Sequence, residues 1–181
     1  MLKKTIVVLM AVVSCLLSGC ATAGLPKPPV HMPFAVQNRG TIIETELQIM
    51  KDRSYRFAIL FYYYGKAPNA DSERVRKLAG YHAKDWNNQY TVPGVAVPIE
   101  FKIEGINNYG EKVLIEKEVL VVGYNTHGFR GFSNSIGGSF GRKIEHIRLK
   151  PGIYRITVKN MKDIPELSGT PVTFSVYSFV P

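Results

Sequence analysis

The chain has 181 residues, 45% of them hydrophobic, and carries a formal net charge of +9. That length fits one domain of ordinary size, which can bury a sizeable core without disulfide staples. A basic protein favours anionic surfaces such as lipid headgroups, lipopolysaccharide, wall polymers or acidic proteins. The charges are spread along the chain without a block of like sign, so a solvated basic surface with no specific partner is the alternative.

The first twenty residues carry the pattern of a secretory signal. Lys3 and Lys4 form a basic start, an apolar stretch runs from Ile6 to Leu17, and small residues precede Cys20. A membrane-spanning helix needs roughly 20 apolar residues. The shorter stretch here is therefore predicted to be a signal peptide over residues 1–19.

The run Leu-Ser-Gly-Cys at positions 17–20 resembles the lipobox of bacterial lipoproteins. The resemblance implies cleavage between Gly19 and Cys20 by signal peptidase II, with Cys20 carrying a diacylglycerol and an amide-linked acyl chain. Two or more acyl chains make a firm membrane anchor. Cys15 leaves with the signal, so the mature domain has no disulfide and depends on packing.

Ala21 follows the cysteine, where the family's inner-membrane retention signal is an aspartate. The resemblance therefore implies the outer membrane, with the domain facing the periplasm. Membrane contact through the anchor on Cys20 is expected, together with a protein or envelope-glycan partner. Nucleic acid is not an expected partner in that compartment.

The segment after the anchor is rich in proline. Prolines at positions 26, 28, 29 and 33 favour extended polyproline II, so we expect residues 20–33 to form a tether. At about 3.1 Å per residue, such a tether would hold the domain some 35 Å from the bilayer. The folded domain is expected to cover residues 34–181.

The domain is predicted to be mainly β, because apolar and polar residues alternate in most of its segments. The expected strands are 41–49, 55–64, 97–106, 111–122, 140–149, 154–159 and 172–177. Apolar positions in 140–149 switch from even to odd numbers, which predicts a β-bulge. About seven or eight such strands favour an antiparallel β-sandwich, Ig-like or jelly-roll-like.

One short helix is predicted between the second and third of these strands. Asp71 is expected to cap it, and Gly80 follows its last residue. Val75, Leu78 and Ala79 form an apolar stripe that would cover one face of the strand at 55–64. A second short turn is expected at 165–169.

Four stretches together resemble a family of small Gram-negative lipoproteins with a single β-sandwich domain of unknown function. They are Arg74–Gly80, Pro93–Ile99, Leu149–Arg155 and Pro165–Val172. The resemblance covers nearly the whole mature chain. It implies a fold but no catalytic residues, because these motifs are turns and strand starts.

Motifs that carry chemistry are scarce. The histidines at 31, 82, 127 and 146 have neither the helical i, i+4 spacing nor the cysteine partners of a zinc site. No Gly-x-Ser-x-Gly elbow precedes a helix. Gly137–Lys143 lacks the spacing of a phosphate loop, so we interpret it as a flexible connection that enters a strand. We therefore expect no enzyme activity, metal or cofactor.

Two segments, 81–90 and 123–138, combine aromatic rings with amides, as binding loops do. Function concentrates in long loops on a rigid scaffold, so both are candidate binding loops. The alternative is that Trp86 folds back and plugs one end of the sandwich. The candidate binding residues are Tyr81, Trp86, Tyr90, Phe129, Arg130 and Phe132.

Three hypotheses for the function follow. The first is a non-enzymatic binding or interaction domain anchored to the outer membrane, with both aromatic loops at one end of the sandwich. The second is an immunity-type lipoprotein that neutralises a toxin delivered into the periplasm, a role that suits a small rigid domain. The third is envelope maintenance through contact with peptidoglycan or lipopolysaccharide.

Overall fold

The structure is a computed structural model that describes residues 24–84, 89–107, 110–122 and 137–178. Residues 1–23 lie outside this range, and with them the predicted signal peptide, Gly19 and Cys20. In chain order the elements are β1 (Val30–Pro33), β2 (Ile42–Ile49), β3 (Arg53–Tyr64), α2 (Ala70–Ala79), β4 (Tyr81–Lys84), β5 (Gln89–Val92), β6 (Val97–Asn107), β7 (Gly110–Val121), β8 (Gly137–Leu149), β9 (Gly152–Asn160), the 3₁₀ turn η2 (Pro165–Leu167) and β10 (Val172–Ser178).

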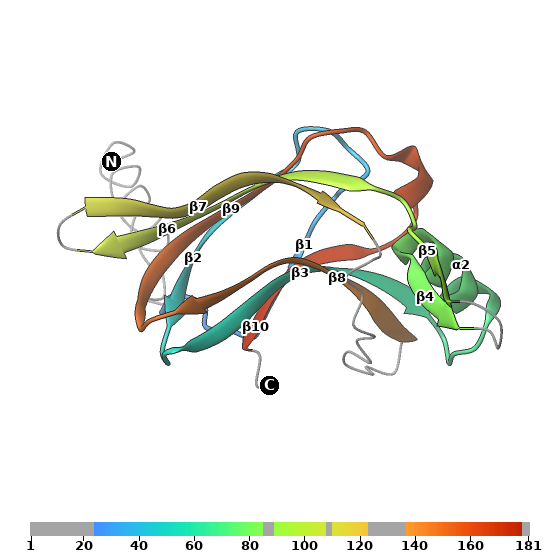
Figure 1. Cartoon of the computed structure of the whole chain (residues 1–181), viewed down its shortest axis with the longest axis horizontal. Coiled ribbons are helices and arrows are strands. Elements are labelled where there is room, and N and C mark those ends of the chain that lie inside the picture. The colour runs from blue at the N-terminus through green and yellow to red at the C-terminus, as the bar shows by residue number, and fades with distance from the viewer. Residues whose placement is uncertain (1–23, 85–88, 108–109, 123–136, 179–181) are drawn as a thin grey trace, which may run out of the picture.

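Among the described strands, eight form two antiparallel sheets that face each other (Figure 1). The first sheet has the order β1-β10-β3-β8, and the second has the order β2-β9-β6-β7. Strands β4 and β5 pair with each other in a separate small sheet. The predicted antiparallel β-sandwich with one short helix is confirmed.

The core lies between the two sheets and follows the alternation read from the sequence. On β6, Val97, Ile99, Phe101 and Ile103 are fully buried. The Phe101 ring packs across the sandwich against Phe57 of β3, with 5.3 Å between ring centroids. Aromatic pairs at this separation add about 0.5–1.5 kcal/mol to the free energy gained by burying their area.

The bulge predicted between residues 140 and 149 is present in β8. Phe57 of β3 pairs with Glu145 and the next residue, Ala58, pairs with Lys143, so Ile144 is the extra residue. A bulge shifts the side-chain alternation by one position. Arg142 and the bulged residue Ile144 are buried at even positions, and Leu149 is buried at an odd position after the bulge.

Helix α2 begins two residues earlier than expected, and its cap is Asn69 rather than Asp71. The Asn69 side chain accepts a hydrogen bond from the Ser72 amide at 2.7 Å, and the Ser72 hydroxyl accepts one from the Asn69 amide at 2.9 Å. This reciprocal capping box satisfies two amides that a helix start would leave unpaired. The Asp71 carboxylate instead accepts from the Tyr64 amide at 2.7 Å. Gly80 ends the helix as predicted.

The folded part starts before residue 34, which corrects the tether expected over residues 20–33. The Gln48 amide donates to the Pro26 carbonyl at 2.9 Å, and β1 pairs with β10 over residues 30–33. Proline-rich sequence is compatible with this strand because β1 is the outermost in its sheet. Pro33, which lacks an amide hydrogen, is tolerated at such an edge.

The long axis of the sandwich separates two ends (Figure 1). Strand β3 runs between them, and its 12 residues at about 3.3 Å each span roughly 40 Å. The β2–β3 and β8–β9 turns lie at one end, whereas α2 and the β4–β5 hairpin lie at the other (Figure 1). No helix in the described part of the chain is long and apolar enough to cross a bilayer.

Candidate functional site

The structure describes two of the six predicted binding residues. Tyr81 begins β4, and Tyr90 lies in β5, where its backbone pairs with Ala83. Trp86 lies outside the described residues, as do Phe129, Arg130 and Phe132. The segment expected as one loop over 81–90 therefore contains strands at both of its ends, and the connection between them is shorter than predicted.

The β4–β5 hairpin is held tightly against the end of α2. At Gly80 the chain turns from the helix into β4 with φ at 77°, a conformation that favours glycine. A Cβ at this position would lie 2.6 Å from the Pro93 carbonyl oxygen, so only glycine fits. After the hairpin, the Val95 amide donates to the Leu78 carbonyl at 2.9 Å and closes its base.

A buried arginine, Arg142 of β8, joins this base to the end of β7. Its side chain is 0% exposed, and its guanidinium donates to the carbonyls of Leu78, Ala79, Val95 and Val121. The bond from Nη1 to the Val121 oxygen is 3.1 Å long. One side chain thus forms hydrogen bonds to three separate segments: the end of α2, the chain before β6 and the end of β7.

This arrangement brings together the starting points of both candidate loops. Leu78 and Val95 flank the hairpin that contains Trp86, while Val121 and Arg142 flank the segment 123–136. The sequence predicted that the loops share one end of the sandwich. The described residues place their attachment points there; the loop residues themselves lie outside the described ranges.

The environment of Arg142 keeps its charge in place. Burial lowers the pKa of its guanidinium to about 10, so the group stays protonated at neutral pH. Leu78 and Ala79 belong to the last turn of α2, where the helix dipole is negative and favours a cation. The Arg142 guanidinium also lies over the Phe61 ring, 4.9 Å from its centroid.

Gly94 makes room for this cation. A Cβ on Gly94 would lie 2.3 Å from Nη2 of Arg142, and the glycine φ is 66°. A larger residue would both strain the backbone and displace the guanidinium. The glycine and the arginine therefore form one structural unit, although 48 positions separate them in the sequence.

Tyr81, one of the predicted binding residues, is engaged inside the domain. The Arg76 guanidinium lies 3.8 Å from the centroid of its ring and also forms an ion pair with Glu73 at 2.8 Å. The hydrogen bond to Glu73 raises the pKa of Arg76. One face of the Tyr81 ring is thus covered by the helix, which favours a positioning role for this residue.

Sequence reasoning missed Arg142, and it interpreted Gly137–Lys143 as a flexible connection. The strand that this connection was expected to enter begins earlier, because β8 starts at Gly137 and includes the whole stretch. A usable signal was present. Arg142 occupies an inward position between Phe140 and Ile144, where a charge must be paired to be tolerated.

The described residues contain no group of three or more His, Cys, Asp or Glu side chains that would hold a metal.

Comparisons with known proteins identify a family and a fold. The family described as "Domain of unknown function (DUF5625)" matches residues 31–178. Among solved structures, the chain is similar to "Crystal Structure of GEBA250068378 from Sulfurospirillum deleyianum", with a TM-score of 0.66 and 21% identity. The match covers 84% of this chain and 98% of that chain, and at this identity it shows the fold alone. No curated protein matches.

Proposed function

The chain belongs to the DUF5625 family, whose function is unknown, and we propose that it is a lipoprotein anchored to the outer membrane through Cys20. Its sandwich acts as a non-enzymatic binding domain on the periplasmic side. The binding surface is the end of the sandwich at which the hairpin and the segment 123–136 are attached. We call this end the loop end; it contains α2, β4, β5 and Arg142.

The proposed anchor is supported by the sequence pattern around Cys20. A basic start, a short apolar stretch and the lipobox-like run end at a single cysteine. Such a cysteine would be an unpaired thiol in a secreted protein unless it were modified. Lipidation accounts for it without a partner thiol.

The observation that carries the proposed binding role is the set of four carbonyls around the Arg142 guanidinium, those of Leu78, Ala79, Val95 and Val121, which we call the carbonyl cage. Long loops that bind partners need a rigid base, since ordering them on binding costs affinity. Here one buried cation fixes the bases of both aromatic segments relative to the core.

The position of the N-terminal segment supports an outward-facing loop end. Residues 26–28 lie beside the β2–β3 turn, which is at the opposite end of the sandwich from α2 (Figure 1). An anchor at Cys20 would therefore leave the loop end facing away from the membrane. Partners in the periplasm would reach it without steric conflict with the bilayer.

Site-specific photocrosslinking in intact cells tests this proposal. A photoreactive amino acid placed at Trp86 or Arg130 should give a discrete adduct with a partner after irradiation. The matched control is Leu114 of β7, which is 41% exposed and lies on a strand rather than in a candidate loop. Adducts that form equally well from Leu114, or none from either loop position, would contradict a binding role for the loop end.

A further inference from the structure

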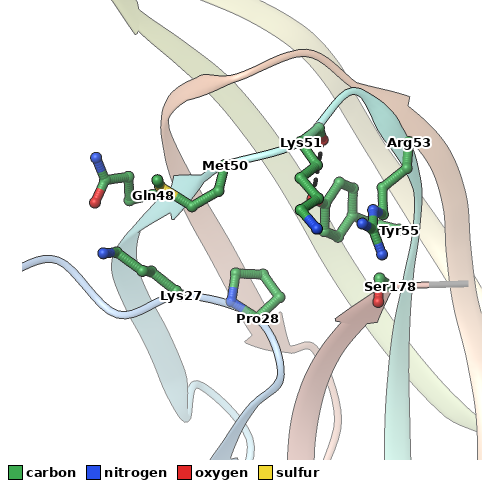
Figure 2. A pocket seen from close by; sticks show the side chains of 8 residues that line it. All are labelled: Lys27, Pro28, Gln48, Met50, Lys51, Arg53, Tyr55 and Ser178. Carbon is green, nitrogen blue, oxygen red and sulfur yellow. Dashed lines mark hydrogen bonds between the residues drawn. The ribbon is translucent and has the colours of Figure 1, made fainter.

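The end of the sandwich opposite the loop end contains a small basic pocket (Figure 2). Its volume is about 210 Å³, below the roughly 300–1,000 Å³ of sites that hold drug-sized ligands. It therefore suits a compact group rather than an extended one. The lining residues that matter for the argument are Lys27, Gln48, Lys51, Arg53, Tyr55 and Ser178.

The charge of this pocket is one-sided. Three cations, Lys27, Lys51 and Arg53, line it, and no lining residue is acidic. Within the described ranges none of the three forms an ion pair, whereas Arg155 and Lys159 of β9 pair with glutamates on neighbouring strands. Like charges that share a pocket repel each other, so a bound anion would relieve this repulsion.

The one acid in the adjoining turn is engaged elsewhere. Asp52 forms an ion pair with Arg148 at 2.7 Å, and the hydrogen bond from Arg148 lowers the pKa of the Asp52 carboxyl. Asp52 is not among the residues that line the pocket. The negative charge of Asp52 is thus already neutralised by a residue of β8. The positive charges of Lys51 and Arg53 therefore remain available to a bound anion.

A hydrogen bond within the chain holds one wall of the pocket. The Tyr55 hydroxyl donates to the Lys51 carbonyl at 3.0 Å, which holds the turn between β2 and β3. Figure 2 shows the nitrogen ends of Lys51 and Arg53 directed toward the space between the Tyr55 ring and Ser178, whereas Lys27 extends along the other side of Pro28. Lys51, Arg53 and the hydroxyl-bearing Ser178 line the same pocket, and together they form a donor set suited to a phosphate.

The pocket also lies close to the proposed anchor. Six peptide units separate Pro26 from Cys20, a span of at most roughly 20 Å. A lipid-modified Cys20 would thus hold the pocket near the headgroups of the bilayer. Anionic headgroups attract basic residues that lie near the membrane surface.

We propose that Lys51, Arg53 and Ser178 form a binding site for the phosphate group of an anionic phospholipid headgroup. Bound in this way, the headgroup would set the tilt of the sandwich and direct the loop end into the periplasm. The lipid as the source of the phosphate rests on the proposed function, whereas the phosphate chemistry of the pocket does not.

Calorimetric titration of the full chain, purified from membranes in a neutral detergent, tests the site. The probes are inorganic phosphate, a short-chain phosphatidylglycerol below its micellar concentration, and a short-chain diacylglycerol that lacks phosphate. We expect the phosphatidylglycerol to bind and the diacylglycerol not to bind. The double variant Lys51→Gln with Arg53→Gln should weaken binding at least tenfold.

The matched control removes the same charge from the same end of the molecule. Lys112→Gln with Lys150→Gln lowers the net charge by two, and neither residue lines the pocket. It should bind like the wild type. An equal loss in both double variants would reduce the effect to diffuse electrostatics and overturn the site, as would binding of the diacylglycerol alone.

Two further results complete the test. Ser178→Asp places a carboxylate in the pocket and should abolish binding, which provides a second variant if the first does not fold. Inorganic phosphate that binds as tightly as the lipid would support the phosphate site and assign it to a soluble ligand. Because calorimetry in detergent does not require the anchor, a chain without fatty acid on Cys20 that still binds phosphate would contradict the proposed function and leave the pocket standing.

Discussion

At the scale of single residues, Arg142 is the feature that most distinguishes this sandwich. A buried cation is costly unless it is fully hydrogen-bonded. Here four main-chain carbonyls and an aromatic ring surround it, and its pKa of about 10 still leaves it charged at neutral pH. The guanidinium thus fills the space where α2, β7 and the chain before β6 meet, a space that apolar side chains fill elsewhere in the core.

Removal of this cation should be among the most damaging single substitutions in the domain. Arg142→Met leaves buried carbonyls without donors, and we expect it to lower the free energy of unfolding by about 3–5 kcal/mol. The adjacent Lys143→Met, which is partly exposed, serves as control and should cost less than about 0.5 kcal/mol. Urea denaturation measures both. A loss for Arg142→Met no larger than that of the control would refute the structural role of the cage.

The core phenylalanine Phe101 provides a second test at this scale. Phe101 is 0% exposed and packs on Phe57, so Phe101→Ala should leave a cavity and cost about 3–5 kcal/mol. Ile42→Ala, at a position that is 53% exposed, removes apolar atoms without opening a cavity. Thermal and urea melts should separate the two variants clearly. Similar stabilities would mean that the sheets do not pack as described.

At the scale of elements, alternation in the sequence was sufficient to predict the long strands and even the bulge at Ile144. It did not predict β1, because four residues that end in proline carry no clear period. It placed the helix cap at Asp71 rather than Asn69, because the reciprocal hydrogen bonds between Asn69 and Ser72 that define the cap depend on a backbone conformation that local pattern does not specify. The carbonyl cage and the basic pocket escaped prediction because each joins segments that are distant in the sequence.

The helix cap gives a prediction at this scale. Asn69→Ala removes the side-chain acceptor of the Ser72 amide and should cost about 1 kcal/mol. Lys66→Ala, in the exposed segment before the helix, should have a far smaller effect. Urea denaturation of the two variants compares them directly. Equal effects would argue against the capping box.

Asp71 makes the start of α2 sensitive to acid. Its hydrogen bond from the Tyr64 amide, and then that from Arg74, lowers the pKa of its carboxyl. A lowered pKa in the folded state adds stability above the ordinary value near pH 4, and that contribution is lost as the pH falls through the lowered value. The gap in melting temperature between the wild type and Asp71→Asn should therefore narrow below about pH 4. A constant gap down to pH 2 would contradict this assignment.

At the scale of the whole molecule, the two ends of the sandwich differ. One end bears Lys51 and Arg53 beside the segment that leads to Cys20. At the other end, Arg142 joins the residues that flank the two candidate binding segments. Strand β3 runs from one end to the other, from Arg53 to Tyr64. This polarity supports the proposed membrane-anchored binding domain, since an anchor and a binding surface at opposite ends do not compete for space.

The anchor itself is the central claim, and the intact mass of the protein purified from cell membranes tests it most directly. We predict a chain that begins at Cys20, with the mass of the residues that follow plus a diacylglycerol and an acyl chain. Cys20→Ala should remain unprocessed or appear without lipid. A wild-type product that retains residues 1–19 without added lipid, recovered from the cytosol, would contradict the account.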